Sequence, residues 1–410
     1  MKNMKTLQAT LAAVLLGTTA VRAAETVNVD DRLKKLEKTV DTLQQENKDL
    51  KVQLGWDAKN PVAFVKAGGK ESKISLGGFV HGQGEFGGVP DARFAGIKDR
   101  FFLRRARIAV AGSFKEHFDF KFETDLGANS LSERTGYAGQ LTDAFVNWNR
   151  YEAANVKFGQ FKAPFGYEQL VSDTKLLTIE RSLSNDRLTD GRQIGLGVAG
   201  NFYNKRLGYS VGMFNGTSVN NSFNDNDNFM YVGRLTAVPL VKKVGKEELR
   251  WSIGLDGLYD ENAALSRGGG FGFDSNLTTA GTDNLFTGHR TAFGVDSQLS
   301  WGRFGLEGEF LRAQFEPANG VPSASLDAQG WYAMGTFYVL PKKLQALLKY
   351  ESFDPNLDKA GNKSETWTLG LTYYLKGDDI KFAVNYLLGD QGNGLADNQG
   401  RLLTRLQFVF

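Results

Sequence analysis

Arginine and lysine side chains recur at every second position of several stretches of this chain. In FFLRRARIAVAG, Phe101–Gly112, Arg105 and Arg107 stand two residues apart, which in a strand places both on one face and Phe102 and Ala106 on the other. A guanidinium group binds phosphate or carboxylate through two parallel hydrogen bonds, so a surface built from such groups attracts anions. The candidate anion-binding side chains are Arg105, Arg107, Lys121, Lys157, Lys162, Arg181, Arg187, Arg192, Arg234 and Arg405.

Carboxylates share the predicted faces and connections of these cations. They are Asp119, Glu123, Asp125, Glu307 and Glu309 in alternating stretches, and Glu168, Asp173, Glu180, Asp186 and Asp190 in one long connection. We expect many of these charges to pair with one another, so that they give this surface no net preference for anions or cations. Arg105 and Arg107 are the first candidates, because no acid accompanies them on their own predicted strand.

Few other residues indicate a reaction or a metal site. The chain has no Cys, which excludes thiol chemistry, disulfides and Cys-based zinc sites. Its three His residues show no metal-ligand spacing, and no Ser stands in a recognisable nucleophile motif. The cluster NNSFNDNDN at 220–228 lacks the order of a calcium loop and is interpreted as a polar loop, with calcium binding left open. We therefore expect no enzyme, no metal site and no cofactor.

The predicted strands that position the cations begin at Ile74. From there to the last residue, apolar and polar side chains alternate with a period of two. Phe118 and Phe120 alternate with Asp119 and Lys121, for example, and such segments are about ten residues long, the length of a membrane-spanning strand. We count about sixteen segments, joined by alternately short and long connections. Lipid cannot satisfy the hydrogen bonds of an open sheet edge, so such a set of strands must close. The prediction is an all-β membrane protein with an antiparallel transmembrane β-barrel of about 16 strands over residues 74–410. A soluble β-sandwich or propeller is the alternative fold.

One long connection, 163–190, carries apolar residues of its own. They are Leu170, Val171, Leu176, Leu177 and Ile179. A barrel of sixteen strands leaves an aqueous channel, and long loops within compact domains are usually functional. We expect this segment to fold into the channel and narrow it.

The N-terminal region follows other patterns. Residues 1–23 read as a secretory signal, with Lys2 and Lys5 before an apolar run. Without Lys2, Lys5 and Arg22 the formal charge of +3 falls near zero, so nucleic acid is not an expected partner. Residues 30–54 predict a short α-helical, parallel coiled coil, and 55–73 a linker; an amphipathic helix on the protein's own surface is the alternative. The heptad positions are Leu33, Leu36, Val40, Leu43, Asn47, Leu50 and Leu54.

Four segments resemble the phosphate-selective porin O and P family of bacterial outer membranes. They are FFLRRARIAVAG at Phe101–Gly112, VKFGQFKAPFGYEQL at Val156–Leu170, YVGRLTAVPL at Tyr231–Leu240 and TRLQFVF at Thr404–Phe410. The resemblance implies a sixteen-stranded trimeric porin whose third loop, 163–190 here, folds inward beside a basic pore for phosphate or other small anions. It matches Arg105 and Arg107 to the family's Arg-rich strand and Lys162 to the base of the third loop. The acids of this loop make it close to neutral.

Three functions stay open on the sequence. The first is a passive outer-membrane channel for small anions, including phosphate or polyphosphate. The second is a general porin, or one selective for sugars or organic acids, because the predicted lumen charge is nearly balanced. The third is a tether, in which residues 30–54 contact the cell wall from the periplasm and the barrel is an anchor. The expected partners are outer-membrane lipid, small anionic solutes and further copies of the chain in a homotrimer; the heptad pattern itself favours two strands over three.

Overall fold

The computed structural model describes residues 34–35, 37–42, 63–65, 72–115, 117–127, 139–217, 219–224, 226–262, 288–318, 325–391 and 399–410. The chain divides into two compact units, Met1–Lys66 and Ala67–Phe410. In the first unit, residues 34–35 and 37–42 are helical and β1 spans Ala63–Val65. The predicted signal, the linker apart from β1 and residues 72–73, and every heptad position except Val40 lie outside the described residues. Among the described helices, none has the length and apolar character needed to cross a membrane.

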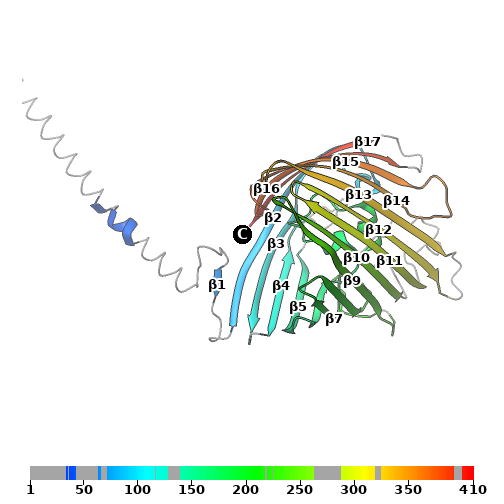
Figure 1. Cartoon of the computed structure of the whole chain (residues 1–410), viewed down its shortest axis with the longest axis horizontal. Helices are drawn as coiled ribbons and strands as arrows, with labels where there is room; N and C mark the ends of the chain where they lie inside the picture. Colours follow the sequence, from blue (N-terminus) through cyan, green and yellow to red (C-terminus); the bar gives the residue numbers. More distant parts are fainter. Residues whose placement is uncertain are drawn as a thin grey trace, which may run out of the picture. The chain divides into compact units, whose positions relative to one another are not determined.

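The second unit is a barrel of antiparallel strands (Figure 1). Sixteen strands are described in it: β2 Ser72–Gly87, β3 Arg100–Phe114, β4 Phe118–Asp125, β5 Gln140–Tyr151, β6 Ala154–Lys162, β7 Arg192–Phe202, β8 Leu207–Phe214, β9 Met230–Val244, β10 Glu247–Asn262, β11 Gly288–Trp301, β12 Phe304–Pro317, β13 Leu326–Leu340, β14 Leu344–Asp354, β15 Ser364–Lys376, β16 Ile380–Gln391 and β17 Gln399–Val409. Each pairs with its neighbour in the sequence, and β17 returns to pair with β2, which closes the sheet. The predicted barrel of about sixteen strands is confirmed.

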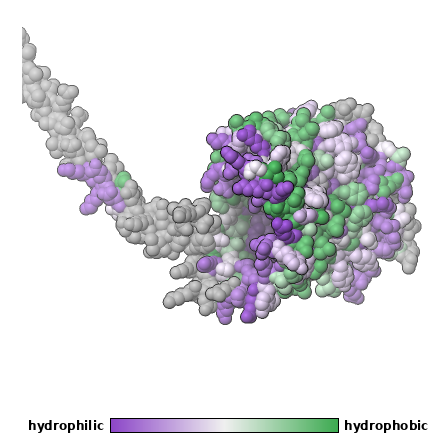
Figure 2. Space-filling view, in the orientation of Figure 1, coloured by the Kyte–Doolittle hydropathy of each residue, from purple (hydrophilic) through white to green (hydrophobic). Residues whose placement is uncertain are grey.

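The two faces of the wall differ as period-two alternation requires. Outward positions such as Phe101, Ile108, Phe158, Leu306 and Leu369 are exposed and apolar. Hydrophobic side chains accordingly cover much of the visible wall of the barrel in Figure 2. Closure satisfies the backbone groups of every strand, so the wall can face lipid with an apolar surface and keep its polar side chains inside.

One irregularity changes which arginines point inward. The pairing of β2 with β3 shifts by one residue, since His81 lies opposite Arg105 while Gly82 lies opposite Leu103. In such a β-bulge the strand register skips Arg104, and two successive residues can take the same side. Arg104 and Arg105 are both buried inside, at 6% and 5% exposure. Because of the shift, Phe102 also lies on the inner side, where it packs with an inner cluster that includes Phe94, so its predicted placement on the outer face is wrong.

The connection between β6 and β7 lies against the inner faces of strands far around the barrel. It contains two short helices, α2 Tyr167–Leu170 and α3 Leu183–Leu188. The side chain of Ser182 caps α3 by accepting from the backbone N–H of Asn185. Helix α3 contacts β12, β13 and β14, and Phe165, Leu183 and Leu188 belong to the largest buried apolar cluster. Apolar packing therefore fixes the course of residues 163–190, which we call the inner segment.

Candidate functional site

One carboxylate of the inner segment, Asp173, lies among three guanidinium groups. Its oxygens are 3.2 Å from Nη2 of Arg105, 2.7 Å from Nη1 of Arg107 and 2.8 Å from Nη1 of Arg181. Burial alone would raise the pKa of Asp173, but the positive charges of Arg105, Arg181 and Arg107 outweigh burial and hold this pKa well below its ordinary value. Asp173 is therefore a charged partner that holds the inner segment against β3.

Glu180 forms the second such contact. Its two oxygens accept from Nε and Nη2 of Arg104 at 3.0 and 3.1 Å, and Oε1 also meets Nη2 of Arg405 on β17. Burial again opposes ionisation, and the charges of Arg104 and Arg405 prevail and lower the pKa of Glu180. The bulge in β3 thus has a direct consequence, because it delivers the guanidinium that binds Glu180 in the bidentate mode.

Barrel carboxylates hold the inner segment from its other side through backbone N–H groups. The N–H of Gly166 donates to Asp256 at 3.2 Å, that of Glu168 to Glu309 at 3.3 Å and that of Leu183 to Glu351 at 3.1 Å. The N–H groups that begin a helix have no partner within the helix, and these positions lie at the starts of α2 and α3. The carboxylates therefore satisfy donors that the helices leave open.

Lysines bind the carbonyl groups of the same segment. Nζ of Lys162, the last residue of β6, donates to the carbonyl of Gln169 at 2.6 Å and of Val171 at 2.9 Å. Nζ of Lys381 on β16 donates to the carbonyl of Thr174 at 2.8 Å. The inner segment is thus bonded to β3, β6, β16 and β17 by cations, and to β10, β12 and β14 by carboxylates.

A strip of more accessible cations lies on β4–β7. Nζ of Lys121 and Nε of Arg192 lie 2.7 and 2.6 Å from the carboxylate of Asp143, and the Lys121 side chain keeps 29% of its surface exposed. Lys157 lies over the ring of Phe145, with its Nζ 4.5 Å from the centroid. No ion pair joins Lys157 to a carboxylate among the residues that the structure describes. These three side chains are positioned to meet a solute in the lumen.

Eight of the ten predicted residues fall in one region of the inner wall. We call these eight residues and Arg104 the basic cluster. The cluster comprises Arg104, Arg105, Arg107, Lys121, Lys157, Lys162, Arg181, Arg192 and Arg405. The acids among these side chains are Asp119, Glu123, Asp125, Asp143, Asp173 and Glu180. Among the described residues of the cluster, nine cations against six acids leave a surplus of three positive charges.

The other two predicted residues lie elsewhere. Arg234 on β9 pairs with Asp256 and Asp296, in the acidic part of the wall on β10–β14, at 2.6 and 2.7 Å. Arg187 lies in α3 and is partly buried. Arg234 therefore balances carboxylates in a region that carries excess negative charge.

Arg104 is the site residue that sequence reasoning missed. Strict alternation assigns it to the face of Ala106 and Ile108, which is the lipid face. An Arg near the middle of a lipid-facing strand costs roughly 2–4 kcal/mol, so the adjacent pair Arg104-Arg105 was itself a signal that the alternation must break.

The described residues show no metal centre. They contain no group of three His, Asp or Glu side chains suited to holding an ion. In the Asn-rich stretch, Asn224 donates to the carbonyl of Asn228, and the N–H of Asn226 donates to Asn224. These amides serve the local loop conformation, and Asp225 lies outside the described part of this stretch.

Comparison with known proteins gives a consistent picture. Residues 82–410 match the model of the family "Phosphate-selective porin O and P". Porin O of Pseudomonas aeruginosa is 23% identical over 372 residues, which are 76% of this chain and 82% of that protein. The barrel is similar to an anion-selective porin from Comamonas acidovorans, with a TM-score of 0.55 and 15% identity over 83% of this chain and all of the other. It is also similar to the trimer form of OmpT of Vibrio cholerae, with a TM-score of 0.55 and 12% identity over the same shares. At these identities the structures establish a shared fold.

Proposed function

This chain belongs to the phosphate-selective porin O and P family, and on that premise we propose that it forms an outer-membrane channel for the passive diffusion of small anions. The observation that carries this proposal is the surplus of positive charge in the basic cluster, beside a segment bonded to the inner wall. Charged side chains that line a pore select for ions of opposite sign. The family description, which names phosphate, and the name of the anion-selective Comamonas porin support the same ion class.

The solutes we propose are small anions, phosphate among them, bound weakly as they pass. Arg105 and Arg107 already bind Asp173, so a phosphate must compete with a carboxylate that belongs to the protein. Lys121, Lys157 and Arg192 offer positive charge with less competition, because Lys157 has no carboxylate partner among the described residues and Lys121 is partly exposed. A channel with these contacts favours throughput over tight binding.

We also propose that the channel is a homotrimer in the bacterial outer membrane. The similarity to the trimer form of OmpT supports three copies, and the short connections of the barrel would face the periplasm. The proposal also includes a periplasmic coiled coil at 30–54 that contacts the cell wall, which rests on the heptad pattern of the sequence.

The testing experiment is the zero-current potential of the purified protein in a planar bilayer under a KCl gradient, repeated with phosphate added. The proposal requires a potential of the sign set by chloride, and a chloride conductance that falls as phosphate occupies the lumen. A potential of cationic sign would contradict it. Free passage of neutral sugars without ion preference would instead support the general porin.

A further inference from the structure

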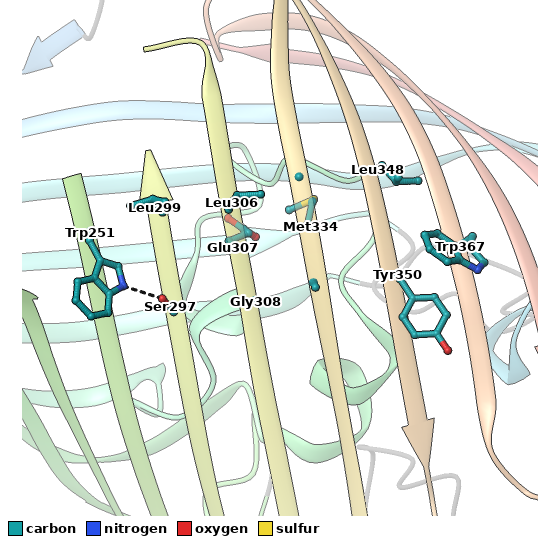
Figure 3. Close-up of a pocket in the computed structure, with 12 residues that line it drawn as sticks. Trp251, Ser297, Leu299, Leu306, Glu307, Gly308, Met334, Leu348, Tyr350 and Trp367 are labelled. Carbon is teal, nitrogen blue, oxygen red and sulfur yellow. Dashed lines mark hydrogen bonds between the residues drawn. The ribbon is translucent and has the colours of Figure 1, made fainter. Parts of the chain in front are cut away.

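The outer wall of the barrel carries a groove that an ion channel does not require. Two adjoining hollows of about 730 and 630 Å³ lie over β10–β15. They share four lining residues, Leu299, Leu306, Gly335 and Leu348, and so form one continuous depression. Figure 3 shows the first hollow, with Trp251 and Trp367 at opposite sides.

Small residues make the depression. Gly308 lies opposite Ala333, and Gly335 lies opposite Leu306, so three positions with little or no side chain adjoin one another on β12 and β13. The neighbouring strands carry bulky side chains, among them Trp251 and Trp367, which stand on either side of this floor. The result is an apolar groove along the outer surface of the barrel.

The lining offers an occupant almost only apolar contact. The indole Nε1 of Trp251 donates to the hydroxyl oxygen of Ser297 at 2.9 Å, so this N–H group has its partner within the lining (Figure 3). The groove lies on the wall that faces lipid, where a hydrocarbon chain is the available apolar partner. Shape therefore points to an acyl chain.

Charge at one end of the groove selects the headgroup. The second hollow ends at Trp301 and Phe304, on either side of the short turn that carries Arg303, and the next short turn carries Lys342 and Lys343. All three basic side chains are exposed, and none forms an ion pair with a carboxylate in the described part of the chain. Lys242 and Lys246 extend the rim toward β9, and the acids there are Glu247 and Glu248, so cations outnumber acids.

We propose that the groove and its basic rim bind an anionic glycerophospholipid of the leaflet that the short turns face. One acyl chain lies over Gly308, Ala333 and Gly335, and the phosphate lies at Arg303, Lys342 and Lys343. Basic clusters at the membrane surface attract anionic headgroups, and aromatic residues mark the interface at this level. The proposal is independent of the proposed ion selectivity, since none of these residues belongs to the basic cluster.

The test is native mass spectrometry of the full-length protein with phosphatidylglycerol or phosphatidylcholine of identical acyl chains. The wild type should retain phosphatidylglycerol in preference. At about fivefold per cation, the triple variant Arg303→Gln/Lys342→Gln/Lys343→Gln should lose roughly 100-fold in affinity for the anionic lipid. The control Lys205→Gln/Arg206→Gln, on another short turn, should bind like the wild type. Equal retention of both lipids by the wild type, or unchanged binding by the triple variant, would overturn the proposal.

A second variant tests the groove separately from the rim. Ala333→Phe fills the floor and should release both lipids, whereas Ala144→Phe on the outer face of β5 should release neither. The chain has no native Cys, so Ala333→Cys also reports whether a second copy covers the groove. Efficient disulfide formation between copies at this position would assign the groove to an interface and refute lipid binding.

Discussion

The carboxylate of Asp173 lies 2.7 Å from the guanidinium of Arg107, across the contact between the inner segment and β3. Both side chains are buried, at about 5% exposure. The same carboxylate also meets Arg105 and Arg181, so one acid contacts three cations, of which Arg107 pairs with Asp125 and Glu123 as well. The charge that a permeating anion experiences thus depends on an acid as much as on the arginines.

Replacing Asp173 with Asn should make the channel more anion-selective. The change removes one negative charge from the basic cluster and takes the carboxylate partner from Arg105 and Arg181, while Arg107 keeps Asp125 and Glu123. The zero-current potential under a KCl gradient should move toward the chloride limit, and phosphate should block chloride current at lower concentration. Asp358→Asn, in an exposed loop, serves as the control. A potential unchanged from that of the wild type would show that Asp173 does not set selectivity.

The bidentate contact between Arg104 and Glu180 should be a strong determinant of stability. Breaking a buried ion pair by removing one partner costs about 3–5 kcal/mol, since the other charge stays buried without compensation. We expect Arg104→Ala and Glu180→Ala each to lower the free energy of unfolding in urea by about that amount. The double variant should lose less than the sum, because both single changes remove the same contact. Strict additivity would mean that the two side chains do not stabilise each other.

Acid should release the inner segment. The pKa of Asp173 and of Glu180 in the folded protein lies below the ordinary values of 3.8 and 4.5. A carboxyl with a depressed pKa contributes stability that is complete above its ordinary pKa and is lost as the pH falls toward the folded-state value. The contribution of these two groups to the unfolding temperature should therefore be constant from pH 8 to about 5.5. It should decrease below about pH 4.5. In Asp173→Asn/Glu180→Gln the fall should be smaller; an equal fall would place the acid sensitivity in other groups.

The barrel was predictable because its cause is local. Lipid on one side and water on the other force a period of two, and that period is visible in residues such as Phe118 to Glu123. The bulge at Arg104 was not predicted, because it shows only as one residue out of phase. The partners of Arg105 and Arg107 were also beyond reach, since Asp173 is more than sixty positions away and meets them only after the inner segment has packed on β12–β14. The sequence predicted the candidate cations, and the fold decides which of them a carboxylate compensates.

The accessible cations on β4–β7, Lys121, Lys157 and Arg192, should contribute to the anion preference of the channel. Lys121 and Arg192 share Asp143, so neutralising both cations leaves a carboxylate facing the lumen. Lys121→Gln/Arg192→Gln should therefore shift the zero-current potential toward the cation limit by more than Lys121→Gln alone. The matched control is Lys363→Gln, whose partner Glu365 lies at the long-loop end of β15, outside the lumen strip. Restoring the preference by adding Asp143→Asn to the double variant would show that the charge balance, and not the loss of particular hydrogen bonds, sets the selectivity. Anion preference that survives in the double variant would move the selective site to Arg105 and Arg107.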